Sequence, residues 1–375
     1  MKKLIAIVLA LALLVTFAAP VMANDPPITT DVTMSSGGGT DPVVKCKWEQ
    51  DTTADLEDGD PLHVHDPGSW FLAPGVKCTT KTIEYYAVVT DAEDMGNVDQ
   101  VYVDVFHPAD SPPPYSTSSD PRGAYFKYEI PMVNLGNLFV TANHDLLVAA
   151  DDFDLVIYGD GFDLAELDAE KDTISLWHGE AEIDYEQPAG DYTVDCYAID
   201  QNGNRSAVLS NTFLYVPLAL LEVDFDSFTY GSVSLGVRKM VVGDLTWSPG
   251  GLVGFDQTEK ATIRNVGNTW ASPKITQDDM GFGKDYTGAW NVSFDARMGN
   301  DDLYKRNYDP DVAKTLPNYL DLSTKEELDL SIKVIKGTSG EKYTGTIVFE
   351  SVDRDFVTPL PDELFGYADP CNGGA

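Results

Sequence analysis

The residues with the clearest capacity for chemistry are oxygen-bearing side chains at alternate positions. Asp200, Asn202 and Asn204 repeat the opening of a calcium-binding loop, in which carboxylate and amide oxygens bind a hard cation. The run then departs from the EF-hand pattern, because its sixth position is Arg205 and its twelfth is Asn211. An ordinary β-turn is the simpler interpretation, and calcium bound at the first three residues is the alternative.

Nitrogen ligands occur together at one place. His63 and His65 flank Val64 and precede Asp66, so two imidazoles would share one strand face, as in a zinc or copper site. No third or fourth ligand is identifiable, and a partly exposed loop accounts for the pair. The sequence has no His-Glu-x-x-His, Gly-x-Ser-x-Gly or Walker motif, and among 61 acidic residues paired carboxylates arise by chance. We therefore expect no enzymatic activity and no cofactor other than calcium, with a secreted hydrolase as the least favoured function.

The four cysteines suggest disulfide bonds. Cys46, Cys78, Cys196 and Cys371 allow three complete pairings, and none has the close spacing of a zinc knuckle or a Cys-x-x-Cys redox site. Structural bridging in an exported chain is therefore the expectation.

Two further residue types point to an extracellular surface. Asn204 and Asn291 each begin an Asn-x-Ser triplet and are candidate glycan acceptors. Trp70, Phe71 and Trp247 are candidate stacking platforms for carbohydrate, although core packing is the commoner use of aromatic side chains.

A short segment before the first predicted strand has an alternating pattern. Ile28, Thr30, Val32 and Met34 alternate with polar residues, and three glycines follow at 37–39. Such a segment would add as a strand to the open sheet edge of a neighbouring subunit and so build a polymer. A disordered spacer is the alternative and the simpler interpretation.

The ends of the chain and its charge indicate the compartment. Residues 1–23 have the charged start, apolar stretch and small-residue cleavage pattern of a secretory signal peptide, followed by a flexible leader at 24–42. Removing Lys2 and Lys3 with the signal lowers the formal net charge from −36 to −38. We expect no membrane span after signal removal, no nucleic-acid partner and no anchor in the tail at 359–375.

The elements that must position these residues are mainly strands. In the first half, β-type patterns bounded by Gly, Pro, Asp or Asn occur at 43–50, 83–90, 98–106, 125–130, 181–185, 191–199 and 208–216. Helical periodicity occurs only at 138–149 and 163–171. This predicts a β domain over 43–217 with a small helical insertion at about 133–172.

The segment 190–200 resembles strand F of immunoglobulin-like modules. Tyr192, Val194 and Cys196 share one face there, and Tyr192 lies near the corner position of such modules. The resemblance makes the strand containing Cys46 equivalent to strand B, which implies a Cys46–Cys196 bridge. A local Cys46–Cys78 bridge is the alternative.

The second half resembles another immunoglobulin-like class of secreted and surface proteins. That class has a Phe/Tyr-Gly-x-Val opening strand, an Asn-x-Gly-Asn turn and a closing Tyr-x-Gly-x-Ile strand, which match 230–236, 265–268 and 343–349. In the turn, Gly267 and Asn268 suit a backbone with positive φ. The resemblance covers about 221–352 and predicts a second β-sandwich domain at 218–358.

The whole layout resembles uncharacterised secreted surface proteins of archaea, notably of methane-metabolising lineages, which carry a signal peptide, an acidic surface and tandem immunoglobulin-like domains. The expectation is an extracellular structural protein of the cell surface or matrix, assembling with itself or with other envelope components through sheet edges. A carbohydrate-binding or adhesion module is the alternative.

Overall fold

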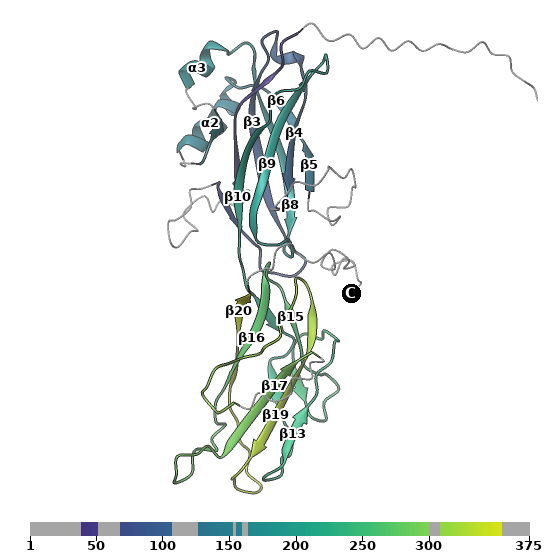
Figure 1. The fold of residues 1–375 in the computed structure, drawn as a ribbon, viewed down its shortest axis with the longest axis vertical. Helices are drawn as coiled ribbons and strands as arrows, with labels where there is room; N and C mark the ends of the chain where they lie inside the picture. The colour runs from purple at the N-terminus through teal and green to yellow at the C-terminus, as the bar shows by residue number, and fades with distance from the viewer. Residues whose placement is uncertain are drawn as a thin grey trace, which may run out of the picture. The chain divides into compact units, whose positions relative to one another are not determined.

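The computed structural model describes residues 39–51, 68–106, 127–152, 155–159, 164–299 and 308–354. These residues form a mainly β fold built of two β-sandwiches, as the sequence predicts (Figure 1). Strands β1–β10 make up the first sandwich and β11–β20 the second, and no ladder among the described residues joins the two sets. The chain passes from one set to the other through residues 217–220.

The first sandwich has two five-stranded sheets. Their strand orders are β6-β8-β3-β1-β7 and β2-β10-β9-β4-β5, and every neighbour is antiparallel except the parallel pair β10 and β2. All seven strands predicted in this half are present, whereas β2, β6 and β7 are too short to be evident in the sequence pattern. The elements are β1 Val43–Asp51, β2 Trp70–Leu72, β3 Thr80–Thr90, the 3-10 helix η1 Met95–Asn97, β4 Val98–Phe106, β5 Lys127–Pro131, β6 Val133–Asn137, β7 Tyr158–Gly159, β8 Ile174–Asp184, β9 Gly190–Asp200 and β10 Leu209–Val216.

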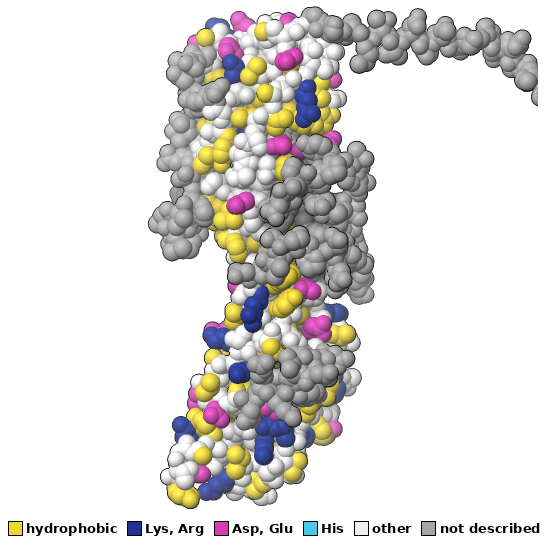
Figure 2. All heavy atoms as spheres, in the orientation of Figure 1, with side chains coloured by type: hydrophobic (Ala, Val, Ile, Leu, Met, Phe, Trp, Pro, Cys, Tyr) yellow, Lys and Arg dark blue, Asp and Glu magenta, His cyan; other side chains and the backbone are white. Residues whose placement is uncertain are grey.

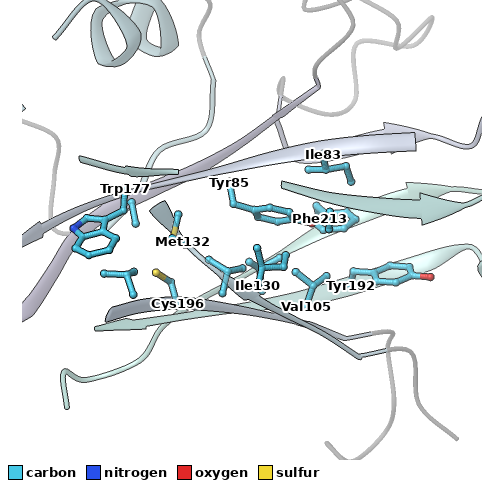
Figure 3. Close-up of a cluster of buried hydrophobic side chains, with 14 of the residues drawn as sticks. Ile83, Tyr85, Val105, Ile130, Met132, Trp177, Tyr192, Cys196 and Phe213 are labelled. Atoms are coloured by element: carbon cyan, nitrogen blue, oxygen red, sulfur yellow. The ribbon is translucent and has the colours of Figure 1, made fainter. Parts of the chain in front are cut away.

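The core of the first sandwich lies between these sheets. Side chains from β3 and β8 meet side chains from β4, β5, β9 and β10 there (Figure 3). The predicted alternation of β9 is confirmed, because Tyr192, Val194 and Cys196 are fully buried on the inner face. The hydroxyl of Tyr192 donates a hydrogen bond of 2.9 Å to the carbonyl oxygen of Pro188, which is the contact of a tyrosine corner.

The predicted helical insertion contains α2 Thr141–Asp152 and α3 Leu164–Ala169, together with β6 and β7. Leu147 of α2 and Leu167 of α3 pack against Trp48, Tyr86 and Val88 on the outer face of the first sheet. This second layer explains why β3 is buried on both faces along most of its length. The two strands of the insertion form the two edges of that sheet.

The second sandwich is formed by shorter strands around one core. In one group β19 pairs with β13, β15 and β17, and in the other β16 pairs with β18 and β20. The elements are β11 Leu221–Val223, β12 Ser227–Thr229, β13 Arg238–Val241, β14 Leu252–Gly254, β15 Thr262–Asn265, β16 Trp270–Gln277, β17 Val292–Met298, β18 Lys314–Thr315, β19 Lys325–Val334 and β20 Ile347–Arg354. The inward side chains of β17 and β19 supply the largest share of the core.

Two strand predictions in this half are wrong in position. Residues 230–236 contain no strand and instead connect β12 to β13, and the closing strand begins at Ile347 and not at Tyr343. Glycines explain the first error, because Gly231 and Gly236 have φ of 62° and 74°, which is turn geometry and not extended backbone.

Gly267 is required for a reason other than the one the sequence suggests. Gly267 and Asn268 are absent from the positive-φ residues, so the expected left-handed turn is wrong. A Cβ on Gly267 would lie 2.0 Å from the carbonyl oxygen of Leu218 and 2.7 Å from the amide nitrogen of Leu220. The position therefore needs glycine because two backbone segments approach closely there.

Candidate functional site

Neither predicted disulfide involving Cys46 is present, since Cys46 and Cys196 are both free and buried. The cause is a β-bulge in β1. Val44 pairs with Val89, but Cys46 pairs with Val88, which leaves Lys45 as the extra residue. The bulge turns Cys46 to the outer face, under the helices, while Cys196 stays in the core between the sheets.

The same bulge places a buried polar cluster between the sheets. Lys47 and Glu49 of β1 are each 1% exposed, and Asn211 of β10 is 8% exposed. Lys47 Nζ donates to Glu49 Oε1 at 2.8 Å and to Asn211 Oδ1. Asn211 Nδ2 donates to Glu49 Oε2 at 3.0 Å. Each member of this Lys47–Glu49–Asn211 cluster therefore contacts the other two.

Pairing across the ladder confirms that the cluster faces inward. Lys47 pairs with Ala87 and Glu49 with Tyr85, and both partners belong to the core between the sheets. Strict alternation from Val44 predicts the reverse, with Lys47 and Glu49 on the outer face of the sheet. The sequence therefore carries no direct signal for this cluster, because the bulge alone decides which face the two charged side chains occupy.

The calcium candidate is a hydrogen-bonded turn. Asp200 Oδ1 accepts from the backbone N–H of Asn202 at 2.8 Å and of Asn204 at 2.7 Å, and Asp200 Oδ2 accepts from Asn204 Nδ2 at 2.8 Å. Burial raises the pKa of Asp200, but the hydrogen bonds from Asn204 and Asn202 outweigh it, so its pKa lies below the ordinary value. The described part of the chain contains no group of three or more His, Cys, Asp or Glu placed to hold a metal. The arrangement fits the turn interpretation, and calcium binding stays a prediction.

Both candidate glycan acceptors use their amide nitrogen inside the protein. Asn291 is 8% exposed and its Nδ2 donates to the carbonyl oxygen of Phe282 at 3.0 Å. Asn204 is half-buried and bonds to Asp200. A glycan on the folded chain would break these bonds, and burial makes this most costly at Asn291.

Of the aromatic platforms, Phe71 belongs to the core of the first sandwich and is 3% exposed, so it cannot stack on a ligand. The ring of Trp247 is covered by the guanidinium of Arg264, whose Cζ lies 3.6 Å from the ring centroid. Trp70 is half-buried on β2, at the edge of its sheet. The three residues do not form one binding surface.

Several predicted features lie outside the described residues. These are the signal peptide, the assembly strand with Ile28, Val32 and Met34, the His63–His65 pair and the tail. In the part that is described, no helix has the length and apolar character needed to cross a membrane.

The open edge at β13 is one of several open sheet edges in the described chain that fit an assembly role. β13 pairs with β19 on one side, and no ladder in the described chain covers its other side. Apolar side chains on this strand's flanks are exposed: Leu235 59%, Val237 58%, Val242 50% and Leu245 55%. We call these four residues the β13 edge. Figure 2 shows that hydrophobic side chains on the visible face are interspersed with polar and charged ones.

A cavity of about 230 Å³ lies beside β17 and is lined by Met298, Asn318, Tyr319 and Glu326, among others. Ligand pockets typically measure about 300–1,000 Å³. Burial, with the nearby carboxylates of Glu327 and Asp321, raises the pKa of Glu326. No nucleophile and base pair accompanies it among the lining residues, so the cavity does not have the composition of an active site.

Comparison with known proteins gives no family for the chain. No model of a known protein family matches it, and no curated protein matches it. Among solved structures, the C-terminal domain of the Streptococcus pyogenes antigen I/II-family protein AspA is 12% identical, with a TM-score of 0.21, covering 82% of this chain and 96% of that one. A Mobiluncus mulieris adhesin with intramolecular disulfide, isopeptide and ester cross-links is 10% identical, with a TM-score of 0.22. The alignment covers 79% of this chain and 99% of that chain.

A third structure is the CsuC–CsuE chaperone–tip adhesion subunit complex of Acinetobacter baumannii, which is 8% identical, with a TM-score of 0.23, covering 70% of this chain and 88% of that one. Similarity at this level does not assign a function to the chain. It also leaves the resemblance to archaeal surface proteins as an expectation. The function of this chain is therefore inferred from its own geometry.

Proposed function

We propose that this chain is an extracellular structural protein of the cell surface or its matrix, without enzymatic activity, which assembles with itself through open sheet edges. The observation that carries the proposal is how the described chain uses its polar residues. The Lys47–Glu49–Asn211 cluster lies inside a sandwich core and Asp200 is bonded within a turn, and neither group lines the described cavity.

Export supports this proposal from the sequence side. The pattern of residues 1–23 predicts secretion, and an acidic, Asp-rich surface keeps a secreted chain soluble. Of the 61 acidic residues, 44 are Asp, which favours turns and strand connections over helices.

The β13 edge supports self-assembly. An uncovered strand with apolar flanks is a template for pairing with another chain. The two charged residues of β13 are engaged within the protein, Arg238 by Asp295 and Lys239 by the carbonyl oxygen of Ser232. The net charge opposes close approach of identical subunits, so we expect assembly to need screening salt or divalent cations.

The test is a concentration series of the secreted protein, followed by sedimentation and negative-stain microscopy. Low salt, high salt, added calcium and added chelator are compared at each concentration. We expect polymers that grow with concentration and require salt or divalent cations. A monomer under every condition would reject self-assembly.

One variant and a matched control locate the contact. Val237→Glu places a charge on the β13 edge and is expected to abolish assembly. Val312→Glu changes a valine of similar exposure, 50%, in the loop just before β18, which pairs with β16 and not with β13, and is expected to have no effect. Equal assembly by both variants would place the contact elsewhere.

The rival function, a carbohydrate-binding or adhesion module, has less support from the geometry. Of its three proposed platforms only Trp70 is neither in the core nor covered by a charged side chain. Retention of the protein on a polysaccharide array, lost in Trp70→Ala, would favour this rival over the structural proposal.

A further inference from the structure

The Lys47–Glu49–Asn211 cluster contains the parts of an amide-forming reaction. An amine, a carboxamide and a carboxyl group meet within hydrogen-bond distance, and each belongs to a side chain at least nine-tenths buried. We propose that Lys47 Nζ and Asn211 Cγ become joined by an intramolecular isopeptide bond, with Glu49 as the catalytic residue that transfers protons between the two nitrogen atoms.

The attacking amine has a base beside it. A lysine nucleophile needs a free electron pair, and a neighbouring base that takes its proton supplies one. The Lys47 amine is held between the sheets with Glu49 as its proton acceptor, and the ring of Tyr158 lies 5.6 Å from Nζ. Transfer of a proton from Nζ to Glu49 removes both buried charges at once.

Glu49 is placed to serve both nitrogen atoms of the reaction. Its Oε1 lies 2.8 Å from the attacking atom, Lys47 Nζ, and its Oε2 lies 3.0 Å from the leaving atom, Asn211 Nδ2. A general acid–base residue needs this reach of about 2.6–3.2 Å to the atoms between which it moves protons. Holding the amine against the carboxamide supplies the proximity that makes an amide exchange fast.

The step balances without a co-reactant. Glu49 takes a proton from the Lys47 ammonium group, and the neutral amine forms a bond to Asn211 Cγ while the carbonyl electron pair moves onto Oδ1. Glu49 protonates Nδ2, the Cγ–Nδ2 bond breaks as the carbonyl re-forms, and the second amine proton passes through Glu49 to the leaving group. The chain loses one ammonia, which leaves as ammonium, and Glu49 ends as a carboxylate.

The bond would join the two sheets covalently. Lys47 lies on β1 of the first sheet and Asn211 on β10 of the second, and the two residues are 164 positions apart. It would therefore close nearly the whole first sandwich into one loop. A structural protein at a cell surface gains resistance to pulling and to proteolysis from such a link, because the sheets cannot separate without breaking a covalent bond.

Peptide mapping of the secreted full-length protein tests the proposal. After denaturation and trypsin digestion, mass spectrometry is expected to find no cleavage after Lys47 and one branched peptide containing both Lys47 and Asn211. That peptide is expected to be lighter than the sum of its parts by one ammonia, about 17 Da. The same deficit is expected in the intact denatured protein.

Three variants give the controls. Glu49→Gln keeps both reacting side chains and is expected to restore the full mass and normal cleavage after Lys47. Asn211→Ala removes the electrophile with the same expected result. Lys45→Arg changes a neighbouring lysine that pairs with Glu170 at the surface, and it is expected to retain the branched peptide.

The wild-type protein decides the question even where a variant fails to fold. Folded wild-type protein with its full sequence mass and ordinary tryptic cleavage after Lys47 would overturn the proposal. A branched peptide that persists in folded Glu49→Gln would instead overturn the role of Glu49.

Discussion

Gly267→Ala is the substitution whose consequence the structure determines most directly. The added Cβ would lie 2.0 Å from the oxygen of Leu218 and 2.7 Å from the nitrogen of Leu220, and real Cβ atoms essentially never approach closer than 3.0 Å. The backbone of one segment must therefore move by about 1 Å or more.

The magnitude can be worked from the hydrogen bonds that this movement stretches. Val266 N–H donates to the oxygen of Leu220 and Asn268 N–H to the oxygen of Leu218, each at 3.0 Å. An added ~1 Å removes both bonds, at about 1 kcal/mol each. Overpacking strain contributes about 1–3 kcal/mol more. We therefore expect Gly267→Ala to lower the free energy of unfolding of the second sandwich by about 3–5 kcal/mol.

The assay is urea unfolding followed by tryptophan fluorescence and calorimetry. Gly96→Ala is the matched control, because its Cβ would meet nothing closer than 3.7 Å and its φ is not positive. A change within about 0.5 kcal/mol is expected there. Equal midpoints and equal slopes for Gly267→Ala and the wild type would refute the close-approach explanation of this glycine.

Three other outcomes are expected. Tyr192→Phe removes the hydrogen bond to the Pro188 carbonyl oxygen and is expected to lower the free energy of unfolding, measured in urea, by about 1–2 kcal/mol. An unchanged urea midpoint would mean that the tyrosine corner does not stabilise the fold. The pKa of Asp200 is lowered in the folded state, so the ionised Asp200 stabilises the fold above its unfolded pKa of about 3.9, and this contribution is lost as pH falls through the folded pKa. Asp200→Asn is therefore expected to make the free energy of unfolding depend less on pH below pH ~4. An acid-unfolding profile identical to that of the wild type would contradict this. Burial raises the pKa of Cys46 and Cys196 to about 12. Both thiols are therefore expected to resist alkylation at pH ~8 until the protein unfolds. Rapid labelling of the native protein would contradict their burial.

The proposed cross-link and the proposed assembly concern different parts of the chain. The cross-link lies inside the first sandwich, and the β13 edge belongs to the second. Loss of one therefore need not alter the other, and Val237→Glu is expected to leave the branched peptide intact.

The fold was largely accessible from the pattern of residues. Period-two alternation between Gly, Pro, Asp and Asn boundaries identified the long strands of the first half, including β4, whose predicted bounds match the structure. Alternation succeeds there because one face of each strand meets a core and the other does not. The pattern was less informative in the second half, where glycine-rich connections such as 230–236 have the composition of strands but the dihedral angles of turns.

The candidate site was not accessible in this way. The sequence by itself determined that the chain is mainly β and acidic, because these properties depend on composition and local periodicity. The resemblance of 190–200 to strand F implied the corner position of Tyr192. Only the tertiary structure decided which side chains meet. One extra residue at Lys45 moves Cys46 away from Cys196 and brings Lys47 and Glu49 to Asn211. A bulge reverses every later side chain on its strand, and only pairing with the neighbouring strand determines where a bulge occurs.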